Sequence, residues 1–334
     1  SQRKGLGMNW NGKRVLVTGA GGFIGSHLAE RLVELGASVR ALVHYNALGT
    51  WGWLDQSELA QDMEVVPGDI CDRDCVHEAV RGCDVVFHLA ALIAIPYSYR
   101  APESYVRTNV IGTLNVVQAA RELGTSRVVH TSTSEVYGTA RYVPIDEKHP
   151  LQGQSPYSAS KLSADKMAES FHLSFDVPLV TVRPFNTFGP RQSARAVIPT
   201  IITQCLVGDV VRLGSTRPTR DLNFVGNTVD GFLKAAAEPK AIGRTINLGS
   251  GREISVGDLA RLIAEIMGQP ITVECDENRL RPNNSEVERL LADNTLAREL
   301  LGWRPEVDLE TGLATTINWM REHVKRYRPG VYVI

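Results

Sequence analysis

The sequence lacks an excess of charge of either sign. Its 36 lysines and arginines nearly balance 37 aspartates and glutamates, which leaves a formal net charge of -1. Nucleic-acid binding requires a basic field, so this balance argues against a nucleic-acid partner. Lysines or arginines that bind an anionic ligand must therefore be gathered at the binding site itself.

Apolar runs long enough to cross a membrane are also absent. The longest candidate, DVVFHLAALIAIPYSY at 84–99, is interrupted by His88 and Pro96 and is typical of a buried strand followed by a loop. The first seven residues, SQRKGLG, are polar and charged, so we expect a remnant of expression and not a signal peptide. No contact with a membrane is predicted.

Cysteines are few and show no framework spacing. Five cysteines, an odd number, fit a reducing cytoplasm better than a disulfide-linked fold, and a cytoplasmic protein is predicted. Cys71, Cys75 and His77 lie close together, but no second cysteine pair accompanies them. Thiols on or near a surface helix are therefore expected, and no metal site is predicted.

Short apolar runs alternate with amphipathic segments along the first two thirds of the chain. Most of the runs are unbroken stretches of valine, isoleucine and leucine, as parallel strands buried on both faces should be. The segment 23–36 places Ile24, Leu28, Leu32 and Leu35 on one helical stripe before a glycine stop. Strands are predicted at 14–19, 38–43, 63–68, 84–90, 127–130, 178–183 and 244–249.

This alternation predicts an α/β fold, a Rossmann doubly wound parallel sheet with a smaller C-terminal substrate-binding lobe. The alternation of apolar runs with amphipathic segments ends after about residue 184, where loops that contain proline and arginine follow. We expect the dinucleotide-binding domain at 8–183 with a return segment at about 221–249, and the smaller lobe at 184–220 and 250–330. The cleft between the two is the expected ligand site.

The motif VTGAGGFIG at 17–25 predicts dinucleotide binding. A strand runs into Gly19, Gly22 and Gly25 at spacing G-x-x-G-x-x-G and then into a helix that begins near Phe23 and Ile24. Without side chains, backbone N–H groups and the positive end of the helix can approach a pyrophosphate. Strand, glycines and helix occur in the required order, which favours a cofactor site over a structural turn.

The motif YSASK at 157–161 indicates acid–base chemistry. Tyr157 and Lys161 are four residues apart, so a helix places both side chains on one face, where an ammonium can lower the pKa of a phenol. An isolated pair of this kind would be more typical of a solvated helix face. Here it follows the glycine motif and the strand-end hydroxyls of STS at 132–134.

Together these motifs resemble the extended branch of the short-chain dehydrogenase/reductase superfamily. The resemblance implies that Thr133, or its neighbour Ser132, acts with Tyr157 and Lys161 in hydride transfer between a sugar carbon and the cofactor. It also implies a tightly bound dinucleotide that is recycled within each turnover. Further cofactor contacts are expected at Asp69, Ile70, Leu89, Ala90 and Ala91.

The stretch STSEVYG at 132–138 places a glutamate directly after the hydroxyls. It resembles nucleotide-sugar 4,6-dehydratases, in which this glutamate removes the C5 proton once C4 is a ketone, so Glu135 is predicted as that base. Glucose-type dehydratases have an aspartate where this chain has Ser134, which leaves open the acid that protonates the departing hydroxyl. Glucuronate decarboxylases share the Ser-Glu pair, and a solvated or helix-capping Glu135 is a further alternative.

The resemblance spans Gly12 to Trp303 and is strongest to N-acetylglucosamine-type 4,6-dehydratases of legionaminic-acid and related bacterial pathways. The segments VHYNALGTWGWLD, HLAALIAIPYSY and RLRPNNSEVERLLAD contribute to it. It implies that Asn186 contacts the substrate diphosphate and that Arg191, Arg220 and Arg281 lie near the nucleotide, since guanidinium groups match phosphate oxygens. Each arginine alone could equally be a surface residue.

The sequence favours NADP slightly over NAD. NAD-preferring enzymes usually place an acid at the end of the second strand, whereas this chain offers Val43, His44, Tyr45 and Asn46. His44 is therefore the expected partner of a 2′-phosphate.

The predicted protein is thus a nucleotide-sugar 4,6-dehydratase that takes GDP- or UDP-N-acetylglucosamine. In the resembling family, helices equivalent to 102–123 and 157–175 pair with their copies, so a homodimer is expected, although Val106, Val110, Leu114 and Val117 could instead cover the sheet. A 4-epimerase, a glucuronate decarboxylase and a non-enzymatic dinucleotide sensor are the alternatives.

Overall fold

A seven-stranded parallel sheet forms the centre of the molecule. The computed structural model describes residues 8–327, so the predicted expression remnant at 1–7 and the last three residues of the predicted lobe lie outside the described residues. The strand order is β11-β6-β5-β4-β1-β2-β3, and every neighbouring pair is parallel. The chain starts in the middle and winds outward in both directions, which confirms the predicted doubly wound Rossmann sheet.

Each strand of this sheet coincides with an apolar run identified in the sequence. Such runs form strands here because helices cover both faces of the sheet, and β4 is buried along its whole length. The strands are β1 (Arg14–Thr18), β2 (Ser38–His44), β3 (Met63–Gly68), β4 (Val85–His88), β5 (Arg127–Thr131), β6 (Leu179–Pro184) and β11 (Thr245–Leu248).

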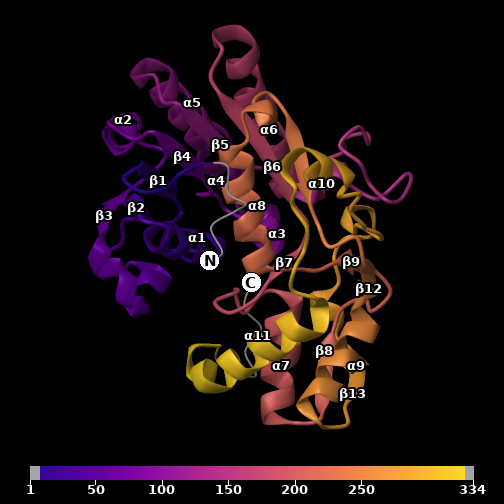
Figure 1. The fold of residues 1–334 in the computed structure, drawn as a ribbon. Coiled ribbons are helices and arrows are strands. Elements are labelled where there is room, and N and C mark those ends of the chain that lie inside the picture. The colour runs from indigo at the N-terminus through magenta and orange to yellow at the C-terminus, as the bar shows by residue number, and fades with distance from the viewer. Residues whose placement is uncertain (1–7, 328–334) are drawn as a thin grey trace.

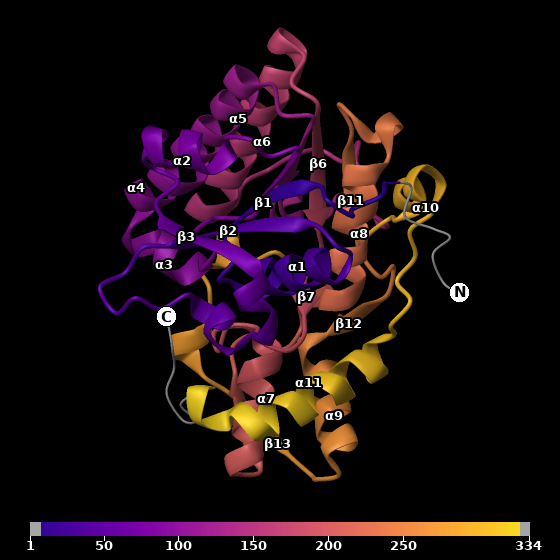
Figure 2. The same ribbon diagram turned by 60° about the vertical axis from the view of Figure 1, so that its left-hand side comes forward.

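Helices cover the two faces of the sheet, as Figure 2 shows. One face carries α2 (Arg73–Val80), α5 (Gly112–Leu123) and α6 (Pro156–Phe175), and the other carries α1 (Phe23–Glu34) and α8 (Val225–Ala237). The predicted helix at 23–36 ends two residues early, at Glu34, and Gly36 then takes a left-handed φ of +85°.

The helix predicted at 102–123 is interrupted in its middle. It consists of α4 (Pro102–Tyr105), a π-helical turn at Val106–Ile111 and then α5, and it follows the short α3 (Ile95–Arg100). A π-helical turn inserts an extra residue into the helix and frequently marks a functional site. It lies here beside α6.

A second, smaller group of elements lies below the sheet in Figure 1 and has its own apolar core, which includes Ile198, Leu259 and Leu313. Its short strands pair as β13 with β8, β12 with β9 and β10 with β7. The boundaries predicted for this lobe stay predictions. Its elements, with the nearby α10, are β7 (Thr187–Phe188), α7 (Val197–Val207), β8 (Val210–Leu213), β9 (Thr219–Asp221), β10 (Asn223–Phe224), β12 (Glu253–Ser255), α9 (Val256–Met267), β13 (Thr272–Cys275), α10 (Thr295–Leu301) and α11 (Leu309–His323).

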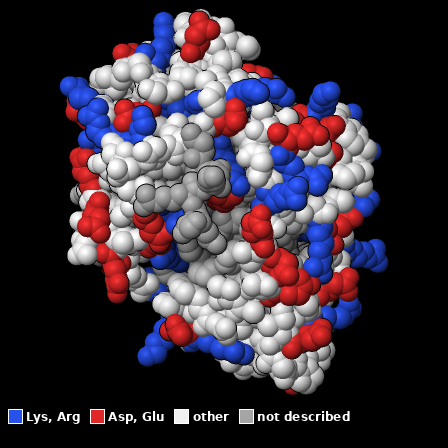
Figure 3. Space-filling model, viewed as in Figure 1, with Lys and Arg blue, Asp and Glu red and all other residues white. Residues whose placement is uncertain are grey.

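Acidic and basic side chains are intermingled on the face of the molecule that Figure 3 shows, in keeping with the balanced composition. Within residues 8–327, no helix combines the length and the apolar character needed to span a bilayer.

Candidate active site

The predicted site residues follow the carboxyl ends of neighbouring strands. Parallel strands bring these ends to one edge of the sheet, where ligands of open α/β sheets bind. The glycine turn follows β1, Leu89 and Ala90 follow β4, and Ser132–Glu135 follows β5. Because β1, β4 and β5 are adjacent in the sheet, these three segments converge at its centre.

The glycine turn is packed so closely that side chains are excluded. Gly19 has a φ of +68°, and a Cβ atom there would lie 2.8 Å from the backbone nitrogen of Ala90. A Cβ atom at Gly25 would lie 2.1 Å from the carbonyl oxygen of Gly19. No side chain caps α1 at Gly22, so the first N–H groups of this helix remain available to an anion. This arrangement fits a dinucleotide pyrophosphate beside Phe23 and Ile24.

The other predicted cofactor residues lie along the same edge. His44, at the end of β2, is exposed and is in register with Gly68 of β3, which Asp69 follows. Asp69 is also exposed, and its Oδ1 accepts the backbone N–H of Cys71 at 2.8 Å. The Thr18 hydroxyl accepts the backbone N–H groups of Leu89 and Ala90, at 3.0 and 3.1 Å, and thereby fixes the start of the segment that includes Ala91. Ile70 is buried against Gly112 of α5.

The α6 helix brings Tyr157 and Lys161 against the end of β5. It begins at a capping box in which Ser155 and Ser158 satisfy each other's backbone N–H groups. Tyr157 and Lys161 are both buried, and the Lys161 ammonium donates to the Thr131 carbonyl at 2.6 Å. The Tyr157 phenol is hydrogen-bonded to Thr133. The structure therefore unites Thr133, Tyr157 and Lys161, as the sequence predicts.

The expected lowering of the Tyr157 pKa is wrong for this structure. Burial raises the pKa of the phenol well above 10, and the hydrogen bond to Thr133 offsets only part of that effect. Burial also lowers the pKa of Lys161 to about 8. The prediction fails because the Lys161 ammonium donates to the Thr131 carbonyl, and burial of the phenol outweighs the hydrogen bond to Thr133 that lowers its pKa.

Glu135 lies inside this group of residues. It belongs to a short 3-10 helix, Ser134–Tyr137, and is only 8% exposed. Thr133 is the capping residue and accepts the Glu135 backbone N–H at 3.2 Å, so the alternative of a solvated or capping glutamate is wrong. Burial is the main cause of the raised pKa of Tyr157, and the charge of Glu135 adds to it. Ser134 is fully enclosed beside it.

Two of the predicted arginines gather around one carboxylate. Arg220 Nη2 donates to Glu286 Oε1 at 3.1 Å, and Arg281 Nη1 lies 3.7 Å from the same oxygen. Burial lowers the pKa of Arg220, and the charge of Glu135 opposes this effect. Buried Arg281 Nη1 and Asn186 Oδ1 have no hydrogen-bond partner among residues 8–327, as expected of groups that bind a polar ligand. Arg220, Arg281 and Asn186 are therefore suited to a diphosphate or its sugar.

Arg191 and Ser132 form other contacts. Arg191 has a φ of +74° and forms a two-pronged ion pair with Glu30 of α1, with nitrogen–oxygen distances of 2.9 and 3.1 Å. Arg191 therefore ties the loop after β7 to α1. The Ser132 hydroxyl donates to the buried carboxylate of Asp165. Of the two hydroxyls proposed for hydride transfer, only Thr133 is bonded to the phenol.

Asn109, which no sequence motif singles out, lies in the π-helical turn and is almost fully buried. Its side chain bonds both the N–H and the C=O of Leu92, at 2.9 and 3.0 Å, and also donates to Ser160 at 2.9 Å. It thereby fixes the 89–92 segment to α6 between Tyr157 and Lys161. A polar residue on an otherwise apolar helix stripe was the available signal.

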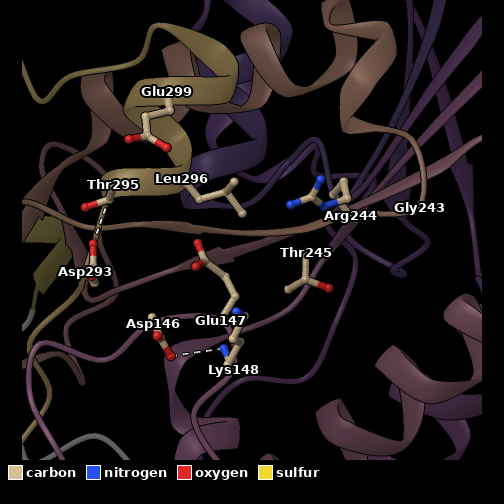
Figure 4. A pocket seen from close by; sticks show the side chains of 10 residues that line it. All are labelled: Asp146, Glu147, Lys148, Gly243, Arg244, Thr245, Asp293, Thr295, Leu296 and Glu299. Atoms are coloured by element: carbon tan, nitrogen blue, oxygen red, sulfur yellow. Dashed lines mark hydrogen bonds between the residues drawn. The ribbon is translucent and has the colours of Figure 1, made fainter.

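A cavity of about 520 Å³ lies elsewhere on the molecule (Figure 4). It is lined by side chains of α10, by Arg244 and Thr245 at the amino end of β11, and by Glu147. Glu147 Oε1 accepts the Asn247 N–H at 2.9 Å and so covers part of the free edge of β11. Because the predicted chemistry lies at the carboxyl ends of the strands, this cavity is not part of that site.

Comparison with known proteins places this site in a set of related enzymes. The sequence family described as GDP-mannose 4,6 dehydratase matches residues 16–316. UDP-glucose 4-epimerase of Mycolicibacterium smegmatis is 36% identical, with 92% of this chain and 98% of that protein covered. dTDP-glucose 4,6-dehydratase of Streptomyces griseus is 34% identical, with coverage of 94% and 96%. UDP-N-acetyl-alpha-D-glucosaminuronate decarboxylase of Bacillus cytotoxicus is 33% identical, with coverage of 93% and 98%.

Solved structures agree with the sequence comparison. UDP-glucuronic acid 4-epimerase of Bacillus cereus, in complex with UDP-glucuronic acid and NAD, superposes with a TM-score of 0.86. The two sequences are 29% identical, and the match covers 93% of this chain and 99% of that one. Fold, site and relatives together define an enzyme of the NAD-dependent nucleotide-sugar dehydratase and epimerase superfamily. The chain belongs to the GDP-mannose 4,6 dehydratase family within the extended short-chain dehydrogenases/reductases, which confirms the resemblance found in the sequence.

Proposed function

We propose that this protein is a nucleotide-sugar 4,6-dehydratase that converts GDP- or UDP-N-acetylglucosamine into the 4-keto-6-deoxy sugar. The observation that supports this choice within the family is the buried carboxylate of Glu135, two residues after Thr133, which bonds the Tyr157 phenol. Oxidation at C4 needs the phenol and the lysine, but elimination across C5 and C6 also needs a base for the C5 proton. In the proposed reaction, Glu135 is that base.

The proposed reaction begins at C4. Tyr157 accepts the proton of the C4 hydroxyl as a phenolate, so binding of substrate and cofactor must lower the phenol pKa that burial raises. Thr133 holds the phenol, and Lys161 supplies positive charge nearby. A bound NAD or NADP supplies the acceptor for the C4 hydride and returns this hydride later in the cycle. Gly19, Gly22 and the start of α1 would hold its pyrophosphate.

The C4 ketone acidifies the neighbouring C5 hydrogen, which Glu135 removes. The electron pair of the broken C5–H bond forms a C5–C6 double bond, and the C6 oxygen leaves as water after it receives a proton. Glu135 holds a proton at that moment and can deliver it to the departing hydroxyl, which requires no acid at Ser134. Hydride addition at C6 and protonation at C5, with the proton that Tyr157 took from the C4 hydroxyl or one exchanged with solvent, then complete the balance: one water is lost and no net oxidation occurs.

Two related reactions start from the same C4 ketone and are known among the relatives, namely epimerisation and decarboxylation. Mass spectrometry of products from a panel of nucleotide sugars separates them. The proposed function requires loss of one water from a GDP- or UDP-N-acetylhexosamine. Loss of carbon dioxide, or a product of unchanged mass, would assign one of the other reactions. Absence of any turnover across the panel would favour a dinucleotide sensor.

The cofactor proposal is that the protein accepts NADP at least as well as NAD. The solved relative described above contains NAD. In this chain, however, β2 ends at an exposed His44 and no carboxylate follows it within the next several residues to repel a 2′-phosphate. Isothermal titration of the apoprotein should give a dissociation constant for NADP no higher than that for NAD. Weaker binding of NADP than of NAD would contradict the proposal.

A homodimer is also predicted. Val106 and Ile111 are exposed on the helical run through the π-helical turn, and Leu173 and Phe175 are exposed at the end of α6. The remaining candidate positions on this run are half-buried or covered, so these side chains provide the apolar surface that pairing requires. Light scattering at micromolar concentration should give twice the chain mass. A monomeric mass would refute the dimer.

All five cysteines are unpaired, which supports the proposed cytoplasmic location.

A further inference from the structure

A cluster of buried polar side chains lies directly behind Tyr157 and Lys161. We call it the Asp165 cluster, and its members are Asp165, His130, Ser132 and Arg183, none more than 4% exposed. Asp165 Oδ1 accepts His130 Nε2 at 2.9 Å, and Asp165 Oδ2 accepts Arg183 Nη2 at 3.1 Å. Ser132 also donates to Oδ2. The Asp165 carboxylate on α6 thus binds His130 of β5, Ser132 just after β5 and Arg183 of β6.

The position of Asp165 in the sequence connects this cluster to the reacting groups. Tyr157, Lys161 and Asp165 are spaced by four residues, so they share one face of α6. On the other side, Ser132 lies between Thr131, whose carbonyl accepts the Lys161 ammonium, and Thr133, which bonds the phenol. The Asp165–Ser132 contact therefore joins the two segments that must stay aligned for Tyr157 to work.

The charges around Lys161 single out Asp165. The other titratable groups around Lys161 are Tyr157 on the same helix, His88 of β4, His130 of β5 and Arg183 of β6. Burial lowers the pKa values of both histidines, which leaves them neutral. Burial would also favour a neutral Asp165, but the hydrogen bond from His130 and the charge of Arg183 outweigh it and lower the pKa of this carboxyl. Asp165 is therefore ionised, and its negative charge opposes the loss of the Lys161 proton caused by burial.

We propose that Asp165 is a positioning residue, the buried counter-charge of Lys161 and the anchor of α6 on the end of β5, which keeps Lys161 cationic beside Tyr157. This role goes beyond the proposed function and applies equally if the enzyme epimerises or decarboxylates its substrate. It also explains why an acid, an arginine and a histidine are enclosed together here, although buried charges are otherwise costly.

A direct titration of Lys161 tests the proposal without any substrate. The chain is labelled with carbon-13 at lysine Cε, and the Lys161→Met variant assigns the Lys161 signal. In the native protein the signal should titrate with a midpoint of about 8. In Asp165→Asn, which keeps an acceptor oxygen but removes the charge, the midpoint should move down by about one pH unit or more. An unchanged midpoint would overturn the proposal.

Two further variants separate charge from structure. Ser132→Ala removes one hydrogen bond to Asp165 and leaves its charge, so the Lys161 midpoint should stay within a few tenths of a unit of the native value. An equal shift in this variant would make the effect structural. Asp165→Asn alone leaves Arg183 uncompensated, so the double variant Asp165→Asn/Arg183→Gln should unfold at a higher temperature than Asp165→Asn, and loss of the positive Arg183 should move the Lys161 midpoint part of the way back up. A double variant no more stable than Asp165→Asn, or one with a still lower midpoint, would contradict the counter-charge role.

Discussion

Replacement of Tyr157 by phenylalanine should lower turnover by at least about a hundredfold, as removal of a positioned acid–base group typically does. Phenylalanine retains the buried ring and its edge contact with Tyr105, at a centroid distance of 6.3 Å, so the fold around the site should persist. The glycine turn contacts other segments, and cofactor binding should therefore change little. Turnover and dinucleotide affinity are measured on the same preparation.

Tyr105→Phe is the matched control for this prediction. Tyr105 is also buried against the site, but its hydroxyl donates to the Ala94 carbonyl at 2.5 Å and has no assigned part in the reaction. Loss of that hydrogen bond should cost about 1 kcal/mol of stability and less than about tenfold in turnover. Near-normal turnover of Tyr157→Phe, or an equal loss in both variants, would remove the Tyr157 phenol from the mechanism.

The sheet could be predicted from the sequence because its signal is local. Strands such as β4 and β6 are short apolar runs between polar turns, and burial on both faces requires that composition. The paired strands of the smaller lobe gave no such signal. β7 and β10 contain two residues each, and they exist only because the fold brings Thr187 beside Asn223. The π-helical turn likewise depends on packing against α6.

The site shows the same division between local and distant determinants. Thr133, Glu135, Tyr157 and Lys161 lie in two short motifs, and the fold brings these motifs together as β5 and α6 pack. Arg191 could not be assigned in this way, because its partner Glu30 is 161 positions away in the sequence and competes with any ligand for the guanidinium. Whether an arginine in a motif faces a ligand or a carboxylate depends on tertiary contacts that the motif does not encode.

The pKa of Tyr157 depends on burial, which the spacing of residues in the sequence does not encode. Helical spacing correctly places Lys161 on the same face of α6, but it says nothing of burial, which acts on both groups in the direction of the neutral forms. The groups that bond these two side chains come from another element. The Thr131 carbonyl, which accepts the Lys161 ammonium, belongs to the last residue of β5, and Thr133 lies just after it. The role of Asp165 likewise depends on its contacts with β5 and β6, which are distant in the sequence.

Replacement of Glu135 by glutamine should stop the reaction half-way. Glutamine keeps the size of the side chain and most of its hydrogen bonding but cannot accept a proton, so oxidation at C4 should proceed while removal of the C5 proton fails. With a GDP- or UDP-N-acetylglucosamine that the native enzyme dehydrates, overall turnover should fall by at least about a hundredfold. Reduced cofactor should accumulate, visible in near-ultraviolet absorbance, with a 4-keto sugar that retains its C6 hydroxyl.

Glu147→Gln provides the matched control, because Glu147 is also partly buried but accepts a backbone N–H at the far end of the sheet. A glutamine oxygen can accept the same bond, so this variant should turn over at the native rate and accumulate no reduced cofactor. In heavy water, the native enzyme should incorporate deuterium at C5 and transfer the original C4 hydrogen to C6. If Glu135→Gln still eliminates water at nearly the native rate, Glu135 is structural and the dehydratase proposal loses its main support. If the native enzyme releases a 4-epimer without loss of water, the family assignment stands and the proposed reaction is wrong.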